Sequence, residues 1–212
     1  MSHQHQHPAR VPRAGGRLFE QLSESREFAE FAQLLKQLTG LSMALNSPGV
    51  EVSCVGVPGD PGNPLCALIR SRPEGASRCE ACDRQQHAEA GSSGAARVYT
   101  CHAGLYDLAI PLLVQGELVA TISSGQVLPE RPSEAGFARL AQRLRWLSVQ
   151  PAKLRRAYHR APWMPRRRLA HIARLLELFA GQLCDSARRI QELEASLERP
   201  EIARARAFIE EH

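Results

Sequence analysis

Four cysteines and one histidine form the most distinctive chemical pattern in the sequence. Cys79 and Cys82 make a C-x-x-C pair; Cys66 precedes it by 12 intervening residues and Cys101 follows it by 18. This spacing lets two sulfur atoms approach one ion from a single turn, and thiolates favour soft divalent metals. We expect zinc at these four cysteines, with His102 as a substitute ligand and an iron–sulfur cluster as the alternative cofactor. The opposing interpretation is that they are reduced thiols, some of them buried as small hydrophobic residues.

A second group of polar residues lies between positions 99 and 107 and at the end of a later strand-like segment. Gly104 within it lets the backbone turn sharply or approach a ligand. The amide of Gln126 offers both a donor and an acceptor, which suits a neutral hydroxylated molecule. An alternative is that these side chains satisfy loop or strand-end backbone. The predicted ligand-binding residues are Tyr99, His102, Tyr106, Asp107, Ser124 and Gln126.

The sequence carries little sign of catalysis. It has no G-x-S-x-G elbow, no P-loop and no dinucleotide-binding fingerprint. Adjacency alone does not make Cys101 and His102 a nucleophile and base, because successive side chains of a strand point to opposite faces. We therefore expect no enzyme; the competing interpretation is a small-molecule reductase that uses a cysteine.

The periodicity of the chain predicts an α+β fold. A helix is expected from Ser25 to Gly40, a β-hairpin over 41–57, and short helices over 65–70 and 79–90. Strands are expected over 98–101, 106–114 and 117–126. Together these predict a PAS- or GAF-like, five-stranded antiparallel sheet with helices on one face and a long C-terminal helix. A domain of this shape holds small ligands between its sheet and helices.

The C-terminal helix has an apolar seam. Positions spaced alternately by three and four residues are apolar with one exception, Ser186, which favours pairing with another helix. The alternative is a long helix that lies on its own domain. The seam residues are Leu169, Ile172, Leu176, Phe179, Leu183, Ser186, Ile190, Leu193 and Leu197.

Composition excludes several classes of protein. The 212 residues are 43% hydrophobic and 23% charged, unlike a disordered chain, a collagen-like fibre or a membrane span. The polar N-terminus shows no secretory signal, so we expect a cytoplasmic protein with reduced cysteines and no membrane partner. Residues 131–200 carry 15 basic and 6 acidic residues. This basic region would suit nucleic acid or a solvated helical surface, but no base-reading motif accompanies it.

Several motifs in order resemble the PocR sensory domain over about residues 20–185. They are CALIR at 66–70, RCEACD at 78–83, YTCHAGLYD at 99–107, IP at 110–111 and SGQV at 124–127. The resemblance implies a variant PAS-type sensor of simple hydrocarbon derivatives, attached to histidine kinases or AraC-type regulators; the family's namesake responds to propanediol. Cys66, Cys79, Cys82, Cys101 and His102 match the family's pattern.

The resulting prediction divides the chain into a disordered lead or tag (1–17), a PocR-like sensor domain (18–165) and a signalling and dimerisation helix (166–200). Residues 201–212 are similar to the first helix of an AraC-type DNA-binding domain. We expect the effector-sensing region of a transcription regulator that binds a small neutral metabolite, such as a diol or sugar, and forms a homodimer. It would reach DNA only through the missing helix-turn-helix domain. The alternative is a cysteine-based redox or metal sensor.

Overall fold

A computed structural model describes residues 14–48, 54–56 and 59–197, which form seven helices and five strands. Residues 1–13 of the predicted lead (1–17), residues 198–200 of the predicted C-terminal helix and the predicted segment 201–212 therefore lie outside the described residues, as does most of the turn of the first hairpin. The elements, in chain order, are α1 (Ala14–Ser23), α2 (Arg26–Thr39), β1 (Met43–Asn46), β2 (Cys54–Gly56), α3 (Pro64–Arg70), α4 (Pro73–Ser93), β3 (Arg97–Thr100), β4 (Tyr106–Val114), β5 (Glu117–Val127), α5 (Glu134–Arg143), α6 (Pro151–Arg160) and α7 (Arg166–Leu197).

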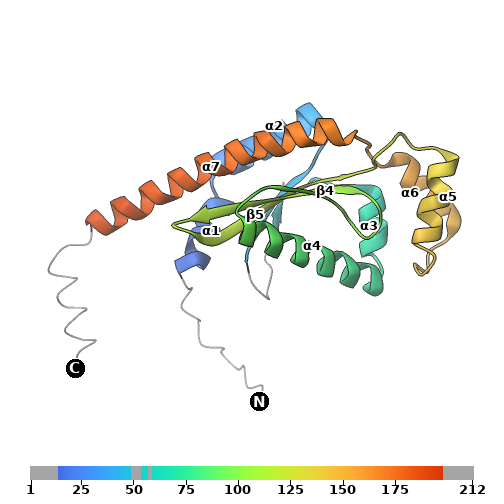
Figure 1. The fold of residues 1–212 in the computed structure, drawn as a ribbon, viewed down its shortest axis with the longest axis horizontal. Helices are drawn as coiled ribbons and strands as arrows, with labels where there is room; N and C mark the ends of the chain where they lie inside the picture. The colour runs from blue at the N-terminus through green and yellow to red at the C-terminus, as the bar shows by residue number, and fades with distance from the viewer. Residues whose placement is uncertain (1–13, 49–53, 57–58, 198–212) are drawn as a thin grey trace, which may run out of the picture.

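The strands form one antiparallel sheet in the order β2-β1-β5-β4-β3 (Figure 1). Its centre is the β4–β5 hairpin, which turns at Gln115 and Gly116 with positive φ angles of 53° and 84°. The predicted α+β class, the five-stranded antiparallel sheet and the long C-terminal helix are confirmed.

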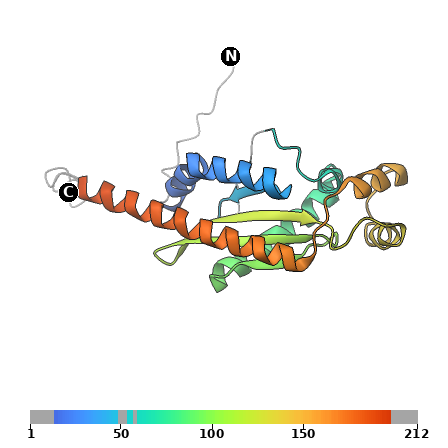
Figure 2. The ribbon, with the colours of Figure 1, turned by 90° about the horizontal axis from the view of Figure 1, so that it is seen from above.

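Helices cover both faces of this sheet, so the expectation of helices on one face was wrong. Figures 1 and 2 show α2 and α7 on one face, whereas α3 and α4 lie on the other. In β4, Leu108, Ile110 and Leu112 pack into the core beneath α7, and Ala109 packs on the α4 side with Ala90. A strand that is covered on both faces has a nearly continuous apolar sequence, as 108–114 does.

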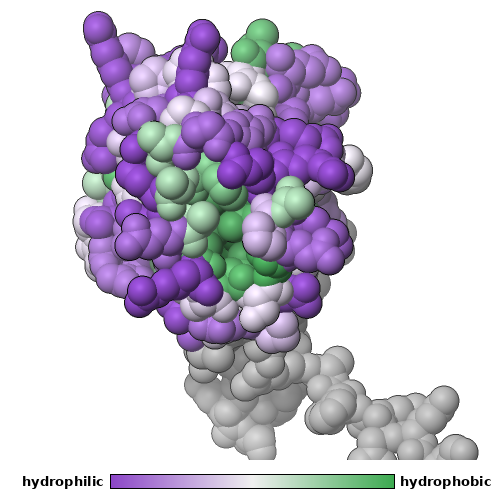
Figure 3. All heavy atoms as spheres, turned by 90° about the vertical axis from the view of Figure 1, so that its right-hand side faces the viewer, coloured by the Kyte–Doolittle hydropathy of each residue, from purple (hydrophilic) through white to green (hydrophobic). Residues whose placement is uncertain are grey.

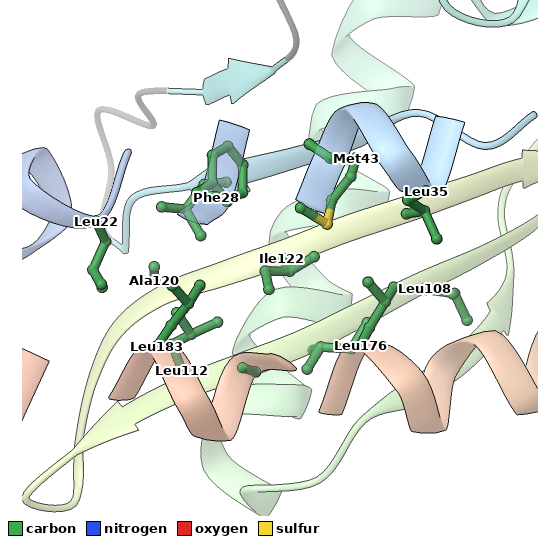
Figure 4. Packing of buried hydrophobic residues seen from close by; sticks show 14 of the residues in the cluster. Leu22, Phe28, Leu35, Met43, Leu108, Leu112, Ala120, Ile122, Leu176 and Leu183 are labelled. Atoms are coloured by element: carbon green, nitrogen blue, oxygen red, sulfur yellow. The ribbon is translucent and has the colours of Figure 1, made fainter. Parts of the chain in front are cut away.

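The main core lies between the sheet and the helices α1, α2 and α7 (Figure 4). Phe28 of α2, Ile122 of β5 and Leu183 of α7 meet there and are at most 3% exposed. Helix α1 also contributes to this core through Leu18, Phe19 and Leu22. The sequence did not predict α1, which begins at Ala14 inside the segment expected to be a disordered lead.

Helix α4 begins two turns earlier than predicted, because Pro73 starts the helix instead of breaking it. Proline has no N–H to donate and is tolerated in the first turn of a helix. Gly75, two residues after Pro73, is also needed, because a Cβ there would overlap the carbonyl of Ile69 in α3. The close contact between α3 and α4 brings Cys66 and Cys79 to the same end of the sheet.

The predicted seam of α7 is largely used within the chain itself. Leu169, Leu176 and Leu183 are buried against the sheet, as the alternative interpretation of this helix expected. The helix then continues past the sheet edge, where Ile190 is 42% and Leu193 is 61% exposed (Figures 1 and 2). Pairing with a second chain stays a prediction, and residues 169–183 of the seam are not free for it.

Candidate functional site

A cavity of about 610 Å³ lies between the sheet and the helices α3 and α4. Strands β1, β3, β4 and β5 form its floor, and the two helices form its roof. Its volume falls within the range of small-molecule sites in proteins. The lining residues are Ala44, Asn46, Arg70, Glu80, Asp83, Arg84, His87, Tyr99, Asp107, Ser123 and Gln126.

The floor presents buried polar groups that are held in place. The amide of Asn46 donates hydrogen bonds to the carbonyl of Thr121 (3.1 Å) and to Oγ of Ser123 (2.9 Å). The carboxyl of Asp107 accepts one from the N–H of Leu108 (3.2 Å). Burial raises the pKa of Asp107 well above its usual range, and the negative charge of Asp83 adds to this. When it is protonated, the carboxyl of Asp107 is both a donor and an acceptor at the cavity floor.

Strand β5 bends beside Asp107. Gly125 has a φ of 112°, and a Cβ there would lie 2.9 Å from the Cα of Asp107. Gln126 follows with a φ of 56°, and its carbonyl accepts a hydrogen bond from the amide of Asn63. The ladder between β4 and β5 shifts register at the same point, between Tyr106 and Asp107. This irregularity places Gln126 on the cavity wall.

Two charged groups at the roof, Arg70 and Asp83, are paired with each other. Nη2 of Arg70 lies 2.7 Å from one oxygen of Asp83, and the phenol of Tyr99 donates to the other oxygen at 3.4 Å. These bonds join α3, α4 and β3 above the cavity. Because the opposite charges of Arg70 and Asp83 offset each other, the roof has no unbalanced charge from this pair.

His87 is a cavity residue that the sequence reasoning missed. Its Nε2 atom is buried and has no hydrogen-bond partner in the described part of the chain. Burial lowers the pKa of this imidazole, which favours the neutral ring. Its spacing of four residues from Asp83 puts both on one face of α4, and this spacing is the signal that the sequence offered.

Three of the six predicted ligand-binding residues line the cavity: Tyr99, Asp107 and Gln126. Ser124 does not, because alternate residues of β5 face opposite ways and Ser123 occupies the cavity side. The Ser124 hydroxyl instead donates to the carbonyl of Ser42 (2.8 Å). Tyr106 packs against the main core beneath the guanidinium of Arg166.

His102 also lies away from the cavity lining, within the cysteine cluster. Its Nε2 is 3.1 Å from Sγ of Cys79, and its ring lies 5.9 Å from that of Trp146. Cys66, Cys79 and Cys101 pack against the apolar cluster of α3, α5 and α6; Cys82 and Cys101 pack beside Tyr99. The four predicted metal ligands thus gather next to the cavity.

The cysteine cluster is the place where the sequence predicts a metal ion. No group of three or more His, Cys, Asp or Glu side chains within residues 14–48, 54–56 and 59–197 is arranged to hold one. Without a bound metal, burial raises the pKa of Cys79 to about 11 and that of Cys101 to about 12. Zinc or an iron–sulfur cluster at these four cysteines stays a prediction.

An apolar end of the molecule covers the cysteine cluster. Figure 3 shows an apolar patch with polar residues around it at the end that carries α3, α5 and α6. Partly buried apolar side chains there include Leu68, Trp146 and Val149. The guanidinium of Arg78 lies 4.3 Å from the Trp146 ring centroid, so the α5–α6 connection is tied to α4.

Comparison with known families assigns most of the chain to one family. The sequence profile described as "Sensory domain found in PocR" matches residues 21–188, which is most of the chain and includes the cavity and the cysteine cluster. The chain belongs to the PocR sensory-domain family. A relative of this PocR domain is the Regulatory protein PocR of Salmonella typhimurium strain LT2, which is 38% identical over 99 residues. The match covers 46% of this chain and 31% of the relative, so the chain spans about a third of that protein's length.

This PocR sensory domain therefore belongs to a family of sensory domains found in regulatory proteins. Within its described residues, no helix is both long enough and apolar enough to cross a membrane. Its cavity is lined by residues within the matched range and has a volume typical of small-molecule sites.

Proposed function

We propose that this PocR domain is the effector-binding region of a transcription regulator and that its effector is a small neutral metabolite with hydroxyl groups. The cavity between the sheet and α3/α4 carries this proposal. Its polar groups are the amide of Asn46, the imidazole of His87 and the carboxyl of Asp107. Burial lowers the pKa of His87 and raises that of Asp107, which favours the neutral form of both. A diol or a short sugar pairs with such groups without bringing a charge that the cavity would leave uncompensated.

The position of the cavity suggests how binding reaches the rest of a regulator. Asp107 of β4 lines the cavity, while its neighbour Leu108 packs into the core beneath α7. An effector that prefers one arrangement of β4 and β5 would therefore bias the position of α7. In the proposed regulator, α7 belongs to a homodimer and leads to an AraC-type DNA-binding domain beyond residue 200.

Calorimetric titration with 1,2-propanediol, glycerol and short sugars, together with thermal stabilisation, tests the proposal. We expect at least one compound to bind, and His87→Phe to weaken that binding about tenfold because a buried hydrogen bond is lost. Gln85→Ala is the matched control, since Gln85 is exposed on the same helix and bonds to Glu89. Absence of both heat and stabilisation across the panel would overturn the proposal.

The cysteine-based alternative has weaker support in the geometry. A reactive thiol needs a lowered pKa, whereas burial raises the pKa of Cys66, Cys79 and Cys101. Metal analysis and the absorbance of anaerobically purified protein test the alternative. A brown, oxygen-labile sample would favour a cluster-based sensor, whereas colourless protein with stoichiometric zinc would indicate a structural site.

A further inference from the structure

Helices α2 and α7 carry nearly all the large apolar side chains that the described part of the chain leaves exposed. Six of seven lie there, and the seventh is Trp163 at the start of the α7 connection. Four of them form what we call the leucine strip: Leu34 (54% exposed), Leu38 (78%), Leu175 (46%) and Leu178 (56%). Figure 2 shows the two helices side by side on the face that the strip occupies. Exposed apolar side chains gathered in this way mark an interaction surface.

The strip is continuous across the two helices. The rings of Phe31 and Phe179 stack at 3.8 Å with an interplanar angle of 6°, which fixes the sides on which α2 and α7 meet. Leu34 and Leu38 follow Phe31 by three and seven residues, so they share its side of α2. Leu175 precedes Phe179 by four residues and shares its side of α7. Leu34, Leu38 and Leu175 therefore line one seam, and Leu178, three residues after Leu175, borders it.

We propose that the leucine strip binds the same strip of a second copy of this chain, about a two-fold axis perpendicular to α2 and α7. This inference rests on the homodimer of the proposed function and locates its interface. An isologous contact requires a self-complementary patch, and a strip with leucines from both helices meets that requirement. The proposed interface does not include the seam residues Leu169, Leu176 and Leu183, because the sheet of the same chain already buries them.

The charges at the ends of the strip select this axis. Helices α2 and α7 run in opposite directions (Figures 1 and 2). Exposed Glu27 lies beyond Phe31 at one end, whereas exposed Arg168 and His171 lie beyond Leu175 at the other. A perpendicular two-fold axis places Glu27 of each copy near Arg168 of its partner. An axis along the strip would oppose like charges, which is unfavourable.

Sedimentation equilibrium of the full chain tests the interface. We expect a dimer that becomes monomeric in Leu38→Glu and Leu175→Glu, because a buried carboxylate would lack a partner. Ala29→Glu and Ala170→Glu are the matched controls on the opposite, exposed sides of α2 and α7 and should stay dimeric. Circular dichroism checks that each variant is folded. A monomeric wild-type chain overturns the proposal, as does a dimer that survives both leucine substitutions.

Charge reversal tests the axis. Glu27→Arg and Arg168→Glu should each raise the dimer dissociation constant about fivefold, and the double variant should restore it. Failure of the double variant to restore dimerisation overturns the perpendicular arrangement. Dissociation by Leu193→Glu but not by Leu175→Glu would instead place the contact on the projecting end of α7. Titration of the monomeric variants with the effector separates failure of the interface from failure of the proposed function. If these variants still bind the effector, the proposed function stands even where the proposed interface is wrong.

Discussion

Tyr99 and Asp83 connect the floor of the cavity to its roof. The phenol on β3 donates to the carboxylate on α4 at 3.4 Å, and the second oxygen of that carboxylate lies 2.7 Å from Arg70 on α3. A single carboxylate thus holds three elements around the cavity. A substitution at Asp83 changes both its hydrogen bond with Tyr99 and its ion pair with Arg70, so the two interactions should behave as one network.

A double-mutant cycle on this pair tests the network. Tyr99→Phe and Asp83→Asn should each lower the free energy of unfolding by about 0.5–1.5 kcal/mol, because each weakens or removes a partly buried hydrogen bond. The double variant should lose less than the sum of the two, since the shared bond is lost only once. Urea unfolding measures all three. Strict additivity would mean that the two side chains do not interact in solution.

Asp107→Asn should stabilise the protein at neutral pH. The folded-state pKa of Asp107 lies above its unfolded value because of burial. Above about pH 4 the unfolded chain therefore loses this proton while the folded chain keeps it, so wild-type stability falls as the pH rises toward the folded pKa. The variant lacks this penalty. Melting temperatures from pH 3.5 to 8 should show a gap in favour of Asp107→Asn that grows with pH.

Asp60→Asn provides the control of opposite sign. Burial alone would raise the pKa of Asp60, but hydrogen bonds from Ser42 and Gly62 and the charge of Lys36 lower it overall. Its contribution to stability is present above the unfolded pKa and is lost as the pH falls through the folded value. The variant should therefore be less stable than the wild type at pH 7 and approach it in acid. A gap with the same sign for both variants would contradict the assignment of Asp107.

Gly125→Ala should destabilise the fold more than Gly116→Ala. Both glycines have a positive φ, 112° and 84°, so both substitutions bring backbone strain of about 1 kcal/mol or more. At Gly125 the new Cβ also meets backbone atoms of Asp107 at 2.9 Å and Tyr106 at 3.0 Å, whereas at Gly116 nothing lies within 4 Å. We expect a total cost of about 2–4 kcal/mol at Gly125. Equal losses in urea unfolding would show that β4 and β5 are less closely apposed.

Local signals predicted the elements that carry them. Ser25 accepts a hydrogen bond from the N–H of Phe28 and Gly40 ends α2 with a φ of 76°, as their residue types indicated. The β4–β5 hairpin followed from its apolar strands and the Gln115–Gly116 turn. Helix α1 was missed because its apolar residues, Leu18, Phe19 and Leu22, adjoin a polar leader and become meaningful only when the sheet buries them.

The site was only partly predictable for the same reason. Tyr99, Asp107 and Gln126 belong to one dense polar region of the sequence, and all three line the cavity. Asn46 and His87 come from β1 and α4, which β2 and α3 separate in the chain, and no local pattern relates them. Only the strand order and the packing of α4 bring these side chains to one cavity.

The seam of α7 leads to a prediction that separates its two roles. Leu176 is fully buried against the sheet, while Leu193, in the same seam, is 61% exposed. Leu176→Ala should cost about 2–5 kcal/mol of unfolding free energy, because it removes buried methyl groups and leaves a cavity. Leu193→Ala should change the same quantity by less than about 0.5 kcal/mol. Urea unfolding at low chain concentration, where a dimer contributes least, makes the comparison. Similar losses at both positions would mean that the end of α7 also packs against folded protein. The apolar periodicity of α7 predicts that one side of the helix is covered, but it does not distinguish the sheet of the same chain from a second chain as the covering surface.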